Sequence, residues 1–138
     1  MSVTLGVITV PGAKIPRSIV ERAFVSLVKN VHDDDWYPRL PTGEVTSAWM
    51  RVEQGETIDS FSINRPPDYE GFPRFWEAIF EVMRQTPTWC IIPGAGWERN
   101  CCVVQADLIS KEMIEFAGGP ERVKVASSAA ELSTSAWA

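Results

Sequence analysis

The amino-acid sequence predicts an α+β fold, a mixed, largely antiparallel sheet of about five to six strands with three helices packed on it. Segments with strand and helix periodicity follow one another in the order β-α-β-β-α-β-β-α-β. Strands in direct succession indicate hairpins, which make most of the sheet antiparallel. The chain has 138 residues, 45% hydrophobic and 22% charged, so we expect a single domain over residues 1–138.

The first elements are a strand and a helix. Residues 5–10 are rich in β-formers and stop at the turn signal Pro11-Gly12. A helix is expected from about Pro16, with Ser18 and Glu21 at the spacing of a capping box. Apolar residues then recur every three to four positions, which predicts one buried stripe: Val20, Phe24, Leu27, Val28 and Val31.

The middle of the chain alternates loops and strands. Residues 32–44 combine three aspartates with prolines and a glycine, which predicts a loop. Residues 47–53 and 57–64 are expected to be two strands joined around Gln54-Gly55 as a hairpin. Residues 65–71 form a second polar loop.

A strongly amphipathic helix follows, opened by Pro73 and closed by Pro87. The continuous apolar runs 89–92 and 101–104 predict strands that are covered on both faces. The expected buried side chains of the helix are Phe75, Ile79 and Met83, flanked by Trp76, Phe80 and Val82. Trp49, Trp76 and Trp89 lie inside regular elements, so we expect them in the core.

The last elements are a helix over residues 107–117, a strand over residues 122–126 and a short terminal helix. Ile109, Met113 and Phe116 should face inward from the first of these helices, and Gly118-Gly119-Pro120 should stop it. The terminal helix has its own capping pair, Ser128 with Glu131.

Charge and composition limit the partners and the compartment. The net charge of −5 opposes binding to phosphate backbones and favours a basic protein partner, so no nucleic acid is expected. No apolar run approaches the roughly 18 residues that span a bilayer, so no membrane partner is expected. The odd set Cys90, Cys101 and Cys102 and the lack of a secretory signal predict a cytoplasmic protein.

Four groups of residues are candidates for a catalytic, metal-binding or phosphate-binding site. A Cys/His nucleophile pair would need His32 to meet a cysteine, yet the cysteines lie in apolar strands where a thiol is inert. Adjacent Cys101 and Cys102 point to opposite faces of a strand, which argues against zinc. The acidic run 33–35 lacks the ligand pattern of a Ca²⁺ loop, and residues 93–96 lack the helix and lysine of a phosphate loop. We therefore expect no catalytic residue, no metal and no cofactor.

Two loops place aromatic rings among carboxylates, as protein–protein hot spots do. Such loops would steer and hold a basic cleft without doing chemistry. The predicted partner-binding residues are Asp33, Asp34, Asp35, Trp36, Tyr37, Asp68, Tyr69 and Glu70, with Trp97 and Glu98 as further candidates.

The layout of the whole chain resembles a known family. It combines these acidic, aromatic loops with a Phe-Trp-rich helix at residues 75–80, the strand end at residues 89–94 and a valine-rich final strand. In this it is similar to the immunity proteins of bacterial polymorphic toxin systems, including those of contact-dependent growth inhibition. The resemblance implies a cytosolic, non-enzymatic inhibitor that binds one cognate toxin domain, often over the active site of the toxin.

Two other functions remain open at this point. A small-molecule-binding or small enzymatic α+β domain would build its pocket from Trp97, Arg99, Asp35 and Tyr69. An adaptor or a homo-oligomer subunit would use the same loop aromatics as a permanent interface.

Overall fold

The computed structural model describes residues 4–93 and 99–137. Within them, a seven-stranded sheet has the order β3-β4-β6-β1-β7-β8-β9, and β2 and β5 form a small second sheet. All neighbours in the large sheet are antiparallel except β8 and β9. The predicted α+β class with a largely antiparallel sheet is confirmed, although the sheet has more strands than expected.

The elements have the following bounds. The strands are β1 (Thr4–Thr9), β2 (Ile15–Pro16), β3 (Asp35–Trp36), β4 (Trp49–Arg51), β5 (Thr57–Ile58), β6 (Ser60–Asn64), β7 (Thr88–Pro93), β8 (Arg99–Val103) and β9 (Val123–Val125). The α-helices are α1 (Arg17–Phe24), α2 (Pro73–Gln85), α3 (Lys111–Ala117) and α4 (Ala129–Trp137). Two short 3₁₀ turns, η1 (Ala106–Leu108) and η2 (Pro120–Arg122), flank α3.

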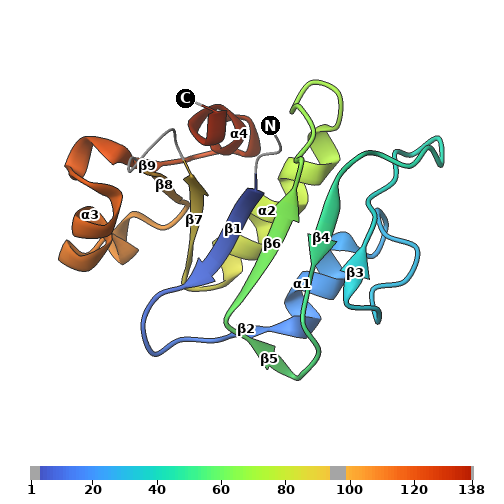
Figure 1. Ribbon diagram of the computed structural model, residues 1–138, viewed down its shortest axis with the longest axis horizontal. Coiled ribbons are helices and arrows are strands. Elements are labelled where there is room, and N and C mark those ends of the chain that lie inside the picture. Colours follow the sequence, from blue (N-terminus) through green and yellow to red (C-terminus); the bar gives the residue numbers. More distant parts are fainter. Residues whose placement is uncertain (1–3, 94–98, 138) are drawn as a thin grey trace.

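Helices α1, α2 and α4 cover one face of the sheet, and α3 lies at the other end of the molecule from α1 (Figure 1). The core lies between the sheet and helices α1, α2 and α4. It contains the large side chains of α2, among them Phe75 and Trp76. Residues of alternate strand positions, such as Val7, Ile63 and Met50, close it from the sheet side. Burial of this apolar surface is the main driving force for the fold.

Helices α2 and α4 begin as the sequence predicts. Pro73 occupies the first turn of α2, where its missing N–H costs nothing. At α4, the Glu131 N–H donates to Ser128 Oγ over 3.2 Å and the Ser127 N–H donates to Glu131 Oε2 over 2.7 Å. The first bond satisfies an N–H group that the first turn of a helix leaves unpaired, and the second ties the residue before the cap to that turn.

The predictions for α1 and α3 were partly wrong. Helix α1 ends at Phe24, and Ser18 makes no capping bond because the helix already begins at Arg17, behind the cap residue Pro16. The predicted helix over residues 107–117 is broken, because the Ser110 side chain accepts from the Met113 N–H and starts α3 there. Phe116, expected to point inward, is 42% exposed.

The two predicted strands do pair antiparallel, with Trp49 opposite Asn64, but a long connection joins β4 to β6 in place of the predicted tight turn around Gln54-Gly55. Strand β5 lies between them in sequence and pairs instead with β2. The predicted loop over residues 32–44 contains the edge strand β3, whose two residues are too few to show a strand period. The runs around Cys90 and Cys102 form β7 and β8, and both cysteines are buried as predicted.

Candidate functional site: the open half of the sheet

Among residues 4–93 and 99–137, a helix covers the second face of the sheet at one end only. Over β7, β8 and β9, α3 packs on a small apolar cluster that includes Ile91, Cys101 and Ala117. Over β3, β4 and β6, the side chains on this face are polar, charged or aromatic and reach solvent. We call this part the open face; its residues are Asp35, Tyr37, Ser47, Trp49, Arg51, Ser62, Asn64 and Arg65.

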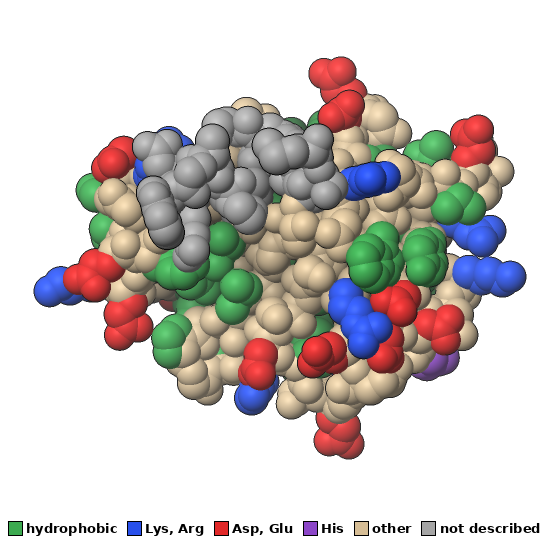
Figure 2. All heavy atoms as spheres, viewed as in Figure 1, with side chains coloured by type: hydrophobic (Ala, Val, Ile, Leu, Met, Phe, Trp, Pro, Cys, Tyr) green, Lys and Arg blue, Asp and Glu red, His purple; other side chains and the backbone are tan. Residues whose placement is uncertain are grey.

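Strand alternation decides which side chains reach the open face. Trp36 and Met50 point into the core with 0% exposure, so their neighbours on β3 and β4 point outward. Trp49 is 41% exposed and Tyr37 is 53% exposed. Asp35 pairs with Arg51 and Trp36 with Met50, so Tyr37 directly follows β3 and Trp49 opens β4. Figure 2 shows hydrophobic side chains next to each other on this face, with acidic and basic side chains beside them.

Hydrogen bonds hold the charged side chains of the open face in place. Trp49 Nε1 donates to Asp35 Oδ1 over 3.1 Å, and Arg51 Nη1 donates to both oxygens of Asp35 over 3.2 and 3.3 Å. Arg51 Nη2 also lies 3.6 Å from Asp34 Oδ2. The hydrogen bond to Asp35 and the nearby carboxylate charges raise the pKa of Arg51 above its ordinary value. Two of the three clustered aspartates are therefore already paired.

A buried arginine positions the segment that leads into β3. Arg17 is 4% exposed, and its guanidinium lies over the Trp36 ring, 5.7 Å from the ring centroid. It donates to the carbonyls of Val31, Asp33 and Glu53 over 2.8 to 3.0 Å. Trp36 Nε1 donates to the same Asp33 carbonyl over 2.7 Å. These bonds fix residues 31–36 against α1, although Arg17 carried no sequence signal that would have singled it out.

Only part of the first predicted loop forms a surface site. Asp33, Asp35 and Tyr37 line one hollow of about 150 Å³ together with Lys29 and Arg39. Asp34 is engaged by Arg51, and Gln54 Nε2 donates to its Oδ1. Trp36 is fully buried, so its ring cannot touch a partner, and the prediction of an exposed contact there was wrong in this respect. Exposed Trp49, expected in the core, takes its place.

The second predicted loop lies elsewhere. Strands β3 and β6 both run antiparallel to β4 and hence in the same direction. Asp33 and Asp34 precede β3, whereas Asp68 and Glu70 follow β6, so the two acidic groups leave opposite ends of the sheet. Tyr69 is half-buried against the core. Trp97 and Glu98 lie outside the described residues.

The alternative pocket drawn from Trp97, Arg99, Asp35 and Tyr69 is not assembled in the described part of the chain. Asp35 is on β3 and Arg99 on β8, and four strands separate these two in the sheet. Trp97 lies outside the described residues. A small-molecule site therefore has to be sought at other residues.

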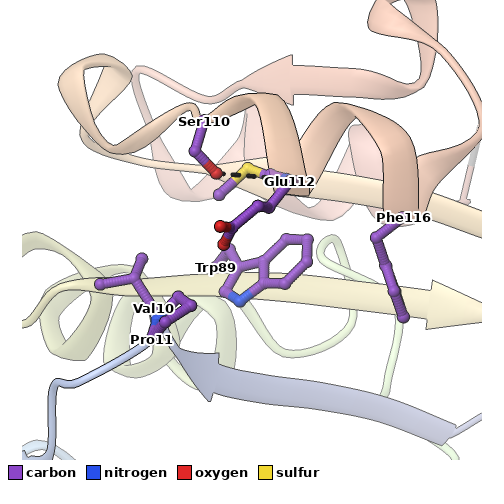
Figure 3. A pocket seen from close by; sticks show the side chains of 7 residues that line it. Val10, Pro11, Trp89, Ser110, Glu112 and Phe116 are labelled. Carbon is purple, nitrogen blue, oxygen red and sulfur yellow. Dashed lines mark hydrogen bonds between the residues drawn. The ribbon is translucent and has the colours of Figure 1, made fainter.

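One such site is a pocket of about 180 Å³ beneath α3. Its walls are apolar, with Trp89 and Phe116 in edge-to-face contact at 5.4 Å between ring centroids. Figure 3 shows the Glu112 carboxylate lying over the Trp89 indole and Val10 and Pro11 closing one side. Trp89, which was expected in the core, has a buried Nε1 that finds no hydrogen-bond acceptor among the described residues.

The cysteines are placed for packing. Burial raises the pKa of Cys90 well above its ordinary value and raises that of Cys102 to about 11. A protonated thiol is a poor nucleophile at neutral pH. His32 is exposed and its Nδ1 lies 3.3 Å from Glu21, the carboxylate that also accepts from Arg17.

No group of three or more His, Cys, Asp or Glu within residues 4–93 and 99–137 is arranged to hold a metal ion. Among the same residues, no helix has the length and apolar character needed to cross a membrane. In comparisons with protein-family models, curated proteins and solved structures, no match to this chain was found.

Proposed function

We propose that this chain is a non-enzymatic inhibitor, an immunity protein that binds and neutralises a cognate toxin domain in the bacterial cytoplasm. The observation that supports it most directly is the exposure of two aromatic side chains, Tyr37 directly after β3 and Trp49 at the start of the neighbouring strand β4. Large, rigid aromatic side chains with a polar surround are the residues that dominate protein–protein affinity.

The side chains around this pair favour a protein partner. Trp49 is held by Asp35, and Asp35 is held by Arg51, so little side-chain entropy remains to be lost on binding. Asp33 is exposed beside them, and the chain as a whole has a net charge of −5. This charge favours fast association with a basic domain, such as one that acts on phosphates.

The test begins with capture on the tagged protein from native cell lysate. The wild type is compared with the double variant Y37A/W49A and with V25A, which removes a side chain that is 59% exposed on the loop after α1. We expect one stoichiometric basic protein that wild type and V25A retain and Y37A/W49A loses. That protein should be toxic when expressed alone and harmless when co-expressed with this chain.

Two results would contradict the proposal. A retained protein that is harmless on its own would mean that the open face binds a partner but does not neutralise a toxin. Retention that is independent of Tyr37 and Trp49 would mean that the docking surface lies elsewhere.

A second function is favoured by one observation, the unpartnered Trp89 N–H at the pocket beneath α3. A buried N–H group without an acceptor can be satisfied by an acceptor atom of a ligand. A domain with this function would bind its small molecule in the pocket without any protein partner. A thermal-shift screen of polar aromatic compounds on wild type and on W89F tests this function. An oligomer built on the open face would instead appear as a dimer in sedimentation, and Y37A/W49A would make it monomeric.

A further inference from the structure

A hollow of about 280 Å³ lies on the open face where β4 begins and β6 ends. It is lined by Ser47, Trp49, Asn64 and Arg65, which the pairing of Trp49 with Asn64 brings together. None of these was singled out as a partner contact in the sequence. Trp49 lines the hollow, which lies at the end of β4 away from Asp33 and Asp34.

The polar groups that line the hollow are hydrogen-bond donors. Thr4 Oγ1 donates to Asn64 Oδ1 over 2.7 Å, which uses the acceptor of that amide and leaves its Nδ2 group to donate. Ser47 is exposed and contributes a hydroxyl. Arg65 contributes the five N–H donors of a guanidinium. No carboxylate is among the described residues that line this hollow.

Arg65 differs from its neighbour Arg51 in one respect. Arg51 is neutralised by Asp35 and Asp34, whereas the residues that the structure describes give Arg65 neither an ion pair nor a hydrogen-bonded side chain. Its backbone is in the left-handed region, with φ of 54°, which is uncommon for a residue with a Cβ. The sheet therefore has Asp33 and Asp34 before β3, whereas after β6 it has Arg65, which no described carboxylate pairs although Asp68 and Glu70 follow it in the chain.

We infer that this hollow is a carboxylate-binding subsite that receives an Asp or Glu side chain of the partner protein. A planar guanidinium with an amide and a hydroxyl beside it matches the two oxygens of a carboxylate, and the Trp49 ring covers the methylene groups that carry them. The inference rests on the proposed function, since it takes the open face as the docking surface. A partner that is basic overall satisfies it by presenting one carboxylate across from Arg65 and its basic groups across from Asp33.

The exposed position of the hollow favours a side chain over a free metabolite. Arg65 and Ser47 are exposed and Trp49 is partly exposed, so the rim is wide and a small acid would keep most of its water. A side chain held by a protein interface loses less entropy on entering such a hollow than a free molecule does.

The test uses two capped amino acids that differ only in charge, N-acetyl-glutamate amide and N-acetyl-glutamine amide. Each is titrated into the ¹⁵N-labelled full chain and followed by two-dimensional NMR. The glutamate compound should bind about five-fold tighter than the glutamine compound, with the largest shifts at Ser47, Trp49, Asn64 and Arg65. R65Q should abolish this preference, and the matched variant R22Q, on exposed α1 behind the sheet, should leave it unchanged.

Three outcomes would overturn the inference. Equal binding of the two compounds would mean that the hollow does not recognise charge. An unchanged preference in R65Q would place carboxylate recognition elsewhere. Micromolar affinity for the isolated glutamate compound would indicate a metabolite site in place of a partner contact. Because no partner is needed, failure here is separate from failure of the capture experiment.

Discussion

The two ends of one face of the sheet differ in their helix cover and in the side chains that they present. At the β7–β8–β9 end, α3 covers the face, and the residues beneath it are apolar. At the β3–β4–β6 end no described helix covers the face, and the outward positions carry Asp35, Trp49 and Arg51. The tryptophans of the two ends show the difference. Trp49 donates to a carboxylate and is partly exposed, whereas Trp89 is packed against Phe116 and its N–H has no acceptor in the part of the chain that the structure describes.

The exposure of an aromatic residue is informative only together with its polar partners. Phe116 is about as exposed as Trp49, yet its ring packs on Trp89 at the edge of a covered pocket. Trp49 is held by a network of charged residues on a surface that nothing described covers. A single exposed apolar side chain is ordinary, but a pre-ordered aromatic pair with charged neighbours is typical of binding surfaces.

The largest expected effect is a difference in stability loss between a core residue, Trp36, and a residue of the open face, Trp49. W36A should lower the free energy of unfolding by about 4 kcal/mol, because it removes a fully buried indole that packs on Phe24. W49A should lower it by less than about 1 kcal/mol, since that side chain is partly exposed. Urea denaturation of both variants measures the difference. Equal losses would mean that Trp49 is as much a core residue as Trp36.

The next largest effect is expected at Arg17, whose hydrogen bonds hold residues 31–36, the segment that leads into β3, against α1. R17M should cost about 3 kcal/mol of stability, because the carbonyls of Val31, Asp33 and Glu53 lose their donor in a buried place. R22M, on the same helix but exposed, is the control and should be within about 0.5 kcal/mol of wild type. A small loss in R17M would show that water replaces the guanidinium.

Partner affinity should distinguish the two ends of the face. W49A should weaken binding to the captured partner by at least about 2 kcal/mol, whereas F116A should leave it unchanged. Isothermal titration calorimetry on the two variants measures this. Loss of affinity in F116A would mean that the covered end also belongs to the docking surface.

The thiol of Cys102, on the core side of β8, makes stability depend on pH in the alkaline range. Its folded pKa of about 11 lies above the ordinary value of 9.0, so the unfolded chain releases the proton first. The stabilising contribution is complete below pH 9 and is lost as the pH rises through the folded pKa, by about 3 kcal/mol at most. Denaturation between pH 8 and 11 should show a steeper decline for wild type than for C102A. Parallel declines would contradict the burial of this thiol.

The smallest effect concerns the covered end. W89F should leave the free energy of unfolding within about 1 kcal/mol of wild type, because it removes a buried donor that has no described acceptor. W49F, which removes a bonded N–H at the surface, is the matched comparison. A loss above about 1.5 kcal/mol in W89F would reveal an acceptor for the indole nitrogen.

The sequence predicted the elements with strong local signals. Pro73 and Thr86 bound α2 closely to the predicted range, and Ser128 with Glu131 caps α4 as expected. Weak local signals failed: β3 has two residues, and Ser110 divides a segment whose apolar spacing looked continuous. The candidate site was half predicted, since Asp33, Asp35 and Tyr37 share a hollow while Trp36 is buried.

By itself, the sequence determined the α+β class, the amphipathic helix α2 and the apolar strands that bury the cysteines, because periodicity and turn residues act over a few neighbours. Only the tertiary structure decided that Trp49 points outward and Trp36 inward, because the face of a strand residue depends on pairing with distant strands. It also separated the acids of the two loops, since β3 and β6 run in the same direction, and it joined Arg65 to Trp49 through the pairing of β4 with β6. Sites built by such long-range pairing have no local sequence pattern from which they could be predicted.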